Sequence, residues 1–369
     1  MSAMGLAAAV NIEDLPQTLA ESVSAEERAL IQKLKTSGLS FAVTRHFASL
    51  AGPDKDDPIR RQFMPDPREE RLDTLSFEDP LGEALFRVTP RLVHQYPDRV
   101  LLLAGGNCAG FCRYCFRRVR MSSPSGFIGA EELAPVLSYI KSRPGIKEVL
   151  VSGGDPLTAC DGDLEDLLVK LRQARPDIMI RICSRIPITN PERITAETIS
   201  LFARFKPLKI VTHINHPREL AQTACQVFAG AVDAGIPVQV QTVLLRGIND
   251  KAEILAELFG RCLNLGLSLY YLFQLDPAPG IAHFRVPLKE GLSIYNDLKN
   301  RYCGKASGGT GGPDLPEAPL QYLPVYALDL PGGGGKIALS ESVIAGNEDC
   351  GKALLLRGPD GKLWRYPSD

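Results

Sequence analysis

The chain has 369 residues, 44% of them hydrophobic, and a formal net charge of −1. This composition supports a folded core in one large domain or two ordinary ones. The balanced charge gives no electrostatic reason to expect nucleic acid or an anionic membrane as a partner. No stretch reaches the roughly 18 apolar residues that a transmembrane helix needs, and the first residues lack the features of a signal peptide.

Residues 1–98 are expected to form an N-terminal arm with helices. Ser24 and Glu27 form an S-x-x-E capping box, which predicts a helix that runs to about Lys35. Residues 52–76 are rich in Pro, Asp and Arg, which favours an extended stretch along the surface.

A regular alternation of strand and helix patterns follows, in a unit expected to span residues 99–300. Each short apolar run is rich in branched or aromatic residues, as buried strands are. The runs lie at 100–104, 147–153, 178–184, 208–214, 238–244 and 267–273, and helical patterns follow them. Strand alternating with helix indicates parallel β/α units. Six units are too few for a closed eight-fold barrel, so periodicity alone leaves a partial barrel and a doubly wound sheet open.

The composition changes after about Arg301, which marks a third unit, 301–369. Residues 304–320 are rich in Gly and Pro and are expected to form a loop insertion. A PGGGGK segment at 331–336 is followed by LLLRGPDGKLWRY, which predicts a hairpin with its turn at PDG.

Three of the nine cysteines, Cys108, Cys112 and Cys115, fall within eight residues directly after the first strand. Thiolates in a close loop are the usual ligands of a [4Fe–4S] cluster, and three in place of four leave one iron open. A structural zinc is the alternative, but zinc usually needs four ligands and no second pair stands nearby. The other cysteines are scattered, which favours a reducing cytoplasm over a disulfide framework.

Eight segments in chain order resemble the lysine 2,3-aminomutase family of radical S-adenosylmethionine (SAM) enzymes. They are HQYPDRVLLL, CRYCFRR, VSGGDPL, RICSRIP, THINHP, VLLRGIND, LDPAPGIAHFR and DLPGGGGK, and the resemblance covers about residues 40–345. It implies an α/β fold, namely a partial (β/α)6 barrel of the radical SAM type. The N-terminal arm and a C-terminal segment that bears pyridoxal 5′-phosphate (PLP) would flank the barrel.

The same resemblance assigns cofactors to residues. The [4Fe–4S] cluster falls to the three clustered cysteines, and the amino end of SAM falls to the strand end Ser152, Gly153, Gly154 and Asp155. Glycine at such a strand end lets the backbone approach a ligand closely. Lys336 matches the catalytic lysine that forms a Schiff base with PLP. Arg99 is the candidate for the PLP phosphate.

The substrate is implied to be a small molecule, namely an amino acid with a basic side chain. Asp276 and Asp329 match carboxylates that bind its distal ammonium, and Arg117 matches the arginine that holds its carboxylate, which suits a planar donor fork. The implied reaction moves the α-amino group of L-lysine, or a similar amino acid, to the β-carbon. An electron donor such as flavodoxin or ferredoxin is implied as a partner, and a homo-oligomer is compatible with the family.

Two alternatives stay open at this point. One is a β-lysine-forming relative that serves the modification of elongation factor P, since CRYCFRR resembles that branch too. The other is a non-catalytic iron–sulfur electron carrier, which would need neither an open iron nor a Schiff-base lysine. Departures from the family pattern are Gln95, where a basic residue is expected, the 304–320 insertion, and a tail with the single cysteine Cys350.

Overall fold

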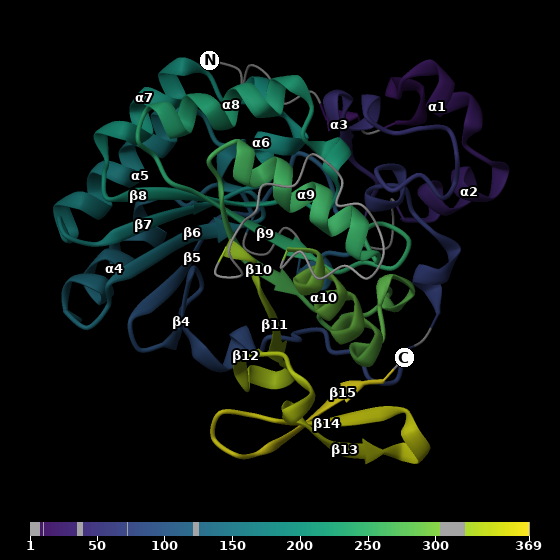
Figure 1. The fold of residues 1–369 in the computed structure, drawn as a ribbon. Helices are drawn as coiled ribbons and strands as arrows, with labels where there is room; N and C mark the ends of the chain where they lie inside the picture. The colour runs from purple at the N-terminus through teal and green to yellow at the C-terminus, as the bar shows by residue number, and fades with distance from the viewer. Residues whose placement is uncertain are drawn as a thin grey trace.

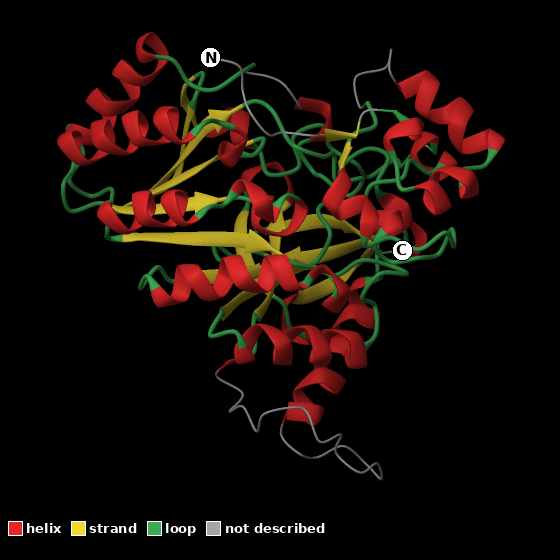
Figure 2. Ribbon diagram, turned by 90° about the horizontal axis from the view of Figure 1, so that it is seen from above, coloured by secondary structure: helices red, strands yellow, loops and turns green. Residues whose placement is uncertain are grey.

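A computed structural model describes residues 8–9, 11–34, 40–71, 73–120, 125–302 and 322–368. A curved sheet of ten strands dominates it, with helices along its outer side (Figures 1 and 2). The strand order is β12-β11-β10-β9-β8-β7-β6-β5-β4-β3. The 304–320 insertion lies outside the described residues.

The strands from β5 to β11 run parallel to one another, and antiparallel strands extend the sheet at both edges. The parallel strands are β5 (Arg99–Gly105), β6 (Glu148–Gly153), β7 (Met179–Cys183), β8 (Leu208–His213), β9 (Val238–Val243), β10 (Ser268–Phe273) and β11 (Val325–Leu330). The antiparallel strands are β3 (Arg87–Thr89), β4 (Leu92–Tyr96) and β12 (Gly335–Ala338).

The topology decides between the two folds that periodicity left open. Parallel strands follow one another in chain order across the sheet, whereas a doubly wound sheet reverses its order at a switch point. Among the described residues the edge strands β3 and β12 do not pair with each other, so the barrel is open. The predicted partial barrel is thus confirmed, and its sheet extends beyond 99–300 on both sides.

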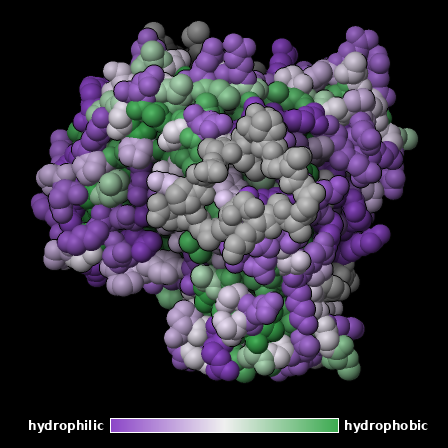
Figure 3. Space-filling model, viewed as in Figure 1, coloured by the Kyte–Doolittle hydropathy of each residue, from purple (hydrophilic) through white to green (hydrophobic). Residues whose placement is uncertain are grey.

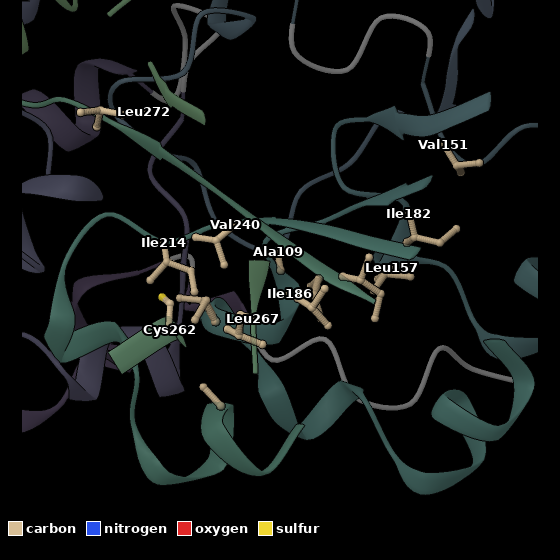
Figure 4. Close-up of a cluster of buried hydrophobic side chains, with 14 of the residues drawn as sticks. Ala109, Val151, Leu157, Ile182, Ile186, Ile214, Val240, Cys262, Leu267 and Leu272 are labelled. Carbon is tan, nitrogen blue, oxygen red and sulfur yellow. The ribbon is translucent and has the colours of Figure 1, made fainter. Parts of the chain in front are cut away.

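The helices that cover the barrel follow its strands in turn. They are α4 (Ala130–Lys141), α5 (Asp161–Ala174), α6 (Ile186–Thr189), α7 (Ala196–Arg204), α8 (Gln222–Asp233), α9 (Ala252–Asn264) and α10 (Leu288–Tyr302). Strand residues that face the helices are apolar and fully buried, as Val151, Ile182, Val240 and Leu272 are (Figure 4). This packing is the main core of the molecule.

The alternate residues of the same strands face away from the helices, because side chains along a strand alternate between its two faces. These residues are polar or aromatic, and most of them are only half-buried. They include Arg99, Glu148, Arg181, Cys183, Lys209, His213, Gln239, Gln241, Tyr271 and Phe273. The inner face of the barrel therefore carries polar, ionisable and aromatic side chains, which can bind cofactors and a substrate.

The N-terminal arm contains α1 (Gln17–Ser22), α2 (Ala25–Leu34) and α3 (Arg45–Ser49), with β1 (Ala8–Ala9) paired to β2 (Val43–Thr44). The predicted capping box is confirmed: Glu27 N donates to Ser24 Oγ (3.2 Å), and Ser24 N donates to Glu27 Oε2 (2.7 Å). Glu27 also forms a two-pronged ion pair with Arg60, whose side chain is 1% exposed. This ion pair connects α2 to the segment 52–76, which contains Arg60.

The C-terminal unit is a small antiparallel sheet of β13 (Ile344–Glu348), β14 (Ala353–Arg357) and β15 (Leu363–Pro367). The hairpin expected around the PDG turn is confirmed as β14 and β15. Figure 1 shows this sheet beside β12, at the end of the chain.

On the face drawn in Figure 3 hydrophilic side chains predominate over the described surface. Within the described ranges, no helix combines the length and apolar character needed to cross a membrane.

The Glu27–Arg60 pair yields a stability prediction. Glu27→Gln should lower the free energy of unfolding by about 3 kcal/mol, because it leaves a buried guanidinium without its counter-charge. Urea unfolding of the wild-type and variant proteins measures this loss. The matched control is Glu26→Gln on the exposed side of the same helix, which should change stability by less than about 0.5 kcal/mol. Equal effects of the two variants would contradict the prediction.

Candidate active site

The cysteine loop leaves the carboxyl end of β5, where sites in parallel α/β folds are usually found. Cys108, Cys112 and Cys115 are all half-buried free thiols. The N-terminal arm holds the loop, since Phe111 N donates to Ala42 O (2.8 Å). Cys115 N donates to Cys112 O (3.1 Å), so the last two cysteines share one turn.

The three thiols act on one another electrostatically. Burial raises the pKa of Cys115 to about 11, and the charge of Cys112 adds to this. Burial also raises the pKa of Cys108, with contributions from Asp155 and the other two cysteines. Arg185 donates to Cys112 Sγ (3.1 Å) and supplies compensating positive charge.

In the part of the chain that the structure describes, no three His, Cys, Asp or Glu side chains are gathered closely enough to hold a metal ion. The three sulfurs therefore would have to turn toward a common point to bind one cluster. The donor set itself fits a cluster, because it supplies three thiols from a single loop with cationic side chains beside it.

The end of β6 needs glycines because the backbone that leads into the cysteine loop passes too close for a Cβ atom. Gly153 has a φ of +117°, and a Cβ there would collide with Gly105 O. A Cβ on Gly154 would collide with Asn107 O. The two strand ends are joined by bonds from Gly154 N to Gly105 O (2.7 Å) and from Asp155 N to Asn107 O (2.7 Å). Backbone hydrogen bonds thus hold the SGGDP segment, which begins at Ser152, directly against the start of the cysteine loop.

The side chain of Asp155 stabilises the SGGDP segment through hydrogen bonds to neighbouring residues. Its carboxylate accepts from Ser184 Oγ (2.7 Å), Arg185 N (2.8 Å) and Leu157 N (3.0 Å). Burial raises its pKa to about 6 even though these bonds act in the other direction. Its side chain is committed to the protein, so contact with SAM would have to come from the backbone of the segment.

Lys336 and Asp329 lie opposite each other on β12 and β11 and form an ion pair. The lysine ammonium lies over the rings of Phe273 (4.1 Å to the centroid) and Tyr271 (5.0 Å) from β10. An amine placed beside aromatic faces and a carboxylate can bind covalently to a flat aldehyde cofactor such as PLP. Gln95, the predicted departure, donates weakly to Gly333 O (3.4 Å) in the glycine segment.

Asp276 follows the end of β10 and joins the same electrostatic group. Burial and, to a lesser extent, the charge of Asp329 raise its pKa to about 8, although Lys336 and Arg117 act in the opposite direction. Its Oδ1 atom is buried and finds no hydrogen-bond partner among the described residues. Asp276, Asp329, Lys336 and Arg117, all predicted as site residues, are therefore brought together.

Arg117 is not free in this structure. Its guanidinium forms an ion pair with Glu83, which is 5% exposed. Glu83 follows Gly82, where a Cβ would press against the backbone of Gly333, so this acid enters the site beside the glycine segment. Sequence reasoning missed Glu83, because nothing in its local pattern distinguishes it from a surface acid.

A second group of inner-face residues was also missed. Arg181 on β7 forms an ion pair with Glu148 and donates to the hydroxyl of Tyr270 (3.2 Å). Burial and the neighbouring Arg181 lower the pKa of Lys209 on β8, and Arg99 contributes to the same effect. Period-two alternation along the strands was the signal that could have found these residues.

Arg99, the predicted phosphate residue, lies at the start of β5 and pairs with Asp98 (2.8 Å). Together with Arg181 and Lys209 it gives this part of the barrel three cations. His213 lies between the two groups: its Nε2 is 2.7 Å from Gln241 Oε1, and its ring stacks near Phe273. Burial lowers the pKa of His213 to about 4, so the ring is neutral at physiological pH.

Sequence comparison relates the chain to one superfamily and, within it, to named relatives. The radical SAM superfamily matches residues 102–259. A relative from Treponema pallidum, named for L-lysine 2,3-aminomutase, is 42% identical over 90% of this chain and 90% of its own length. The L-lysine 2,3-aminomutase of Clostridium subterminale is 34% identical over 92% of this chain and 77% of its own. Among solved structures, Streptococcus suis SuiB aligns with 66% of this chain and 60% of its own, at 15% identity and a TM-score of 0.45.

The open barrel with its cysteine loop, matched by the superfamily, defines a radical SAM enzyme. Within that class the chain belongs to the lysine 2,3-aminomutase family, since relatives of that name match most of its length. It is accordingly an enzyme of the isomerase class, and the cofactors of its family are a [4Fe–4S] cluster, SAM and PLP.

The raised pKa of Asp276 predicts a pH-dependent stability. The folded pKa of about 8 lies above the unfolded value of about 4, so the stability due to neutral Asp276 is complete below pH 4 and lost as the pH rises through 8. The melting temperature of Asp276→Asn relative to wild type should therefore increase steadily from about pH 5 to about pH 8.5. Thermal unfolding of both proteins across this range provides the measurement.

Asp177→Asn is the control for this titration. A hydrogen bond from Arg175 lowers the pKa of Asp177 to about 2, so this acid stays ionised throughout the range. Its difference from wild type should be constant with pH. A constant difference for Asp276→Asn as well would contradict the assignment of a raised pKa.

Proposed function

We propose that this enzyme moves the α-amino group of L-lysine to its β-carbon. The observation that carries the proposal is the convergence of Asp276, Asp329, Lys336 and Arg117 in one electrostatic group beside the cysteine loop. We assign the cluster to Cys108, Cys112 and Cys115, SAM to the Ser152–Asp155 segment, and PLP to Lys336. When bound, these groups would supply a one-electron reductant, a hydrogen-abstracting radical and a π-system that assists the migration of the nitrogen.

The inner face of the barrel carries two groups of side chains that suit the two parts of PLP, its ring and its phosphate. Lys336 stands between Asp329 and the rings of Tyr271 and Phe273, which suits the flat ring of the cofactor. Arg181, Lys209 and Arg99 form the cationic group nearer the start of the strands, which suits its phosphate. The phosphate assignment made for Arg99 is therefore extended to Arg181 and Lys209.

Two acids at the site favour a cationic substrate side chain. Burial is the main cause of the raised pKa of Asp276, and repulsion by the carboxylate of Asp329 adds to it, so ionising both acids is costly. A lysine ammonium relieves this cost, because it supplies a counter-charge when Lys336 no longer pairs with Asp329. A glutamate side chain would add another negative charge.

Arg117 is the residue that we assign to the substrate carboxylate. Its pair with Glu83 leaves guanidinium donors for a second carboxylate, because the fork has five N–H groups. Glu83 would then fix the orientation of the Arg117 guanidinium and favour its charged form. We expect a low-potential donor such as flavodoxin or ferredoxin to reduce the cluster in a reducing cytoplasm, which fits the absence of a disulfide among the eight described cysteines.

Turnover of amino acids tests the proposed reaction. Protein reconstituted without oxygen should convert lysine to β-lysine when SAM, PLP and a reductant are present, and arginine, ornithine and glutamate should react more slowly or not at all. Asp329→Asn should lower kcat/KM for lysine about tenfold or more, because a charge-assisted bond is lost. Chromatography of the β-amino products is the measurement. Preferred turnover of glutamate would contradict the proposal.

Covalent labelling tests the PLP assignment independently of turnover. Borohydride treatment of the PLP-loaded protein should place a pyridoxyl group on Lys336, as read by peptide mapping. Lys336→Ala should abolish the label, and Lys209→Ala, which removes another inner-face lysine, should leave it on Lys336. Label on Lys209 in the wild-type protein would refute the assignment.

A further inference from the structure

The C-terminal sheet touches the candidate site through one strand, β15. Tyr366 on this strand is 0% exposed, and its hydroxyl donates to Leu275 O (2.7 Å). The same hydroxyl accepts from Gln274 Nε2 (3.0 Å). Leu275 is the residue before Asp276, so a tail residue 91 positions away from Leu275 holds the backbone next to a site acid.

Gln274 extends this contact to the second site acid. Its Oε1 accepts a hydrogen bond from the hydroxyl of Tyr326, and its Nε2 also donates to Val286 O (2.7 Å). Tyr326 lies on β11, three residues before Asp329. Tyr366, Gln274 and Tyr326 are each at most 1% exposed, so the network is shielded from water. It links β15, the end of β10 and β11.

Trp364 gives β15 a second contact on the same side of the strand, since residues two apart share a face. A Cβ placed on Gly334 would lie 2.7 Å from the indole ring of Trp364. The indole therefore packs on the glycine segment that leads to Lys336. One strand of the tail supports three segments of the site.

The position of the Asp276 carboxylate depends on this support of its backbone, because few contacts of the side chain itself fix it. Its Oδ1 atom has no hydrogen-bond partner among the described residues, so the position of the carboxylate follows from its backbone. Directional hydrogen bonds in a shielded network hold that backbone more strictly than apolar packing does. Loss of one bond would let the two acids move relative to each other.

We propose that Tyr366 is a positioning residue for the substrate ammonium, and that it acts by fixing Asp276 relative to Asp329 through the Tyr366–Gln274–Tyr326 network. This inference rests on the proposed role of the two acids. It makes the C-terminal sheet part of the substrate site, although none of its side chains is assigned to the substrate.

Tyr366→Phe is the test, because it keeps the buried ring and removes only the hydroxyl. In the PLP-loaded enzyme, the Kd for lysine without SAM and the KM with SAM should both rise about fivefold, which corresponds to one hydrogen bond. The kcat should change less than the KM. Tyr302→Phe is the control, because it deletes the hydroxyl of another buried tyrosine, which is bonded to Ala256 O (3.4 Å) on α9 and not to a member of the network. This variant should leave both constants unchanged.

A double-mutant cycle with Asp276→Asn separates the inference from the proposed function. If Tyr366 acts through Asp276, then Tyr366→Phe should add little to the loss already caused by Asp276→Asn. Additive losses, or unchanged lysine binding in Tyr366→Phe, would overturn the inference alone. Unchanged binding in Asp276→Asn would instead overturn the assigned role of that acid. Calorimetry of lysine binding to the four proteins distinguishes these outcomes.

Discussion

The alternation of side chains along the parallel strands is the constraint on which the rest of the molecule depends. The outward residues must be apolar to pack under the helices, and in β6 and β7 they are valines and isoleucines that are fully buried. The inward residues are thereby free to be polar. Because the strands from β5 to β11 run in one direction, their carboxyl ends meet at one edge, and the cysteine loop and the SGGDP segment lie there together.

Charge compensation organises the interior that this constraint creates. Arg117 pairs with Glu83, Lys336 with Asp329, and Arg181 with Glu148, so most inner cations carry an acid of their own. Buried ions are costly unless they are paired and hydrogen-bonded. Asp276 is the exception among the site acids, and its raised pKa records that cost. A substrate cation can lower the energy of this site because, within the described part of the chain, Asp276 Oδ1 is buried without a hydrogen-bond partner.

Much of this could be predicted from residues close together in the chain. The C-x3-C-x2-C loop, the GGGGK segment and the Ser24–Glu27 capping box are local patterns, and the structure places each at the expected point of the fold. Glu83 and Tyr366 carried no such local signal. Each acquires its meaning from a partner on another element, which a single sequence does not reveal.

The sequence by itself therefore determined the β/α alternation, the family and the chemical types at the site, because these depend on short-range spacing and composition. Only the tertiary structure decided that the barrel is open, that Lys336 pairs with Asp329 across β11 and β12, and that Tyr366 supports the Asp276 segment. The physical reason is that sheet order, register and buried hydrogen bonds join residues far apart in the chain. Their partners are selected by the packing of the whole molecule.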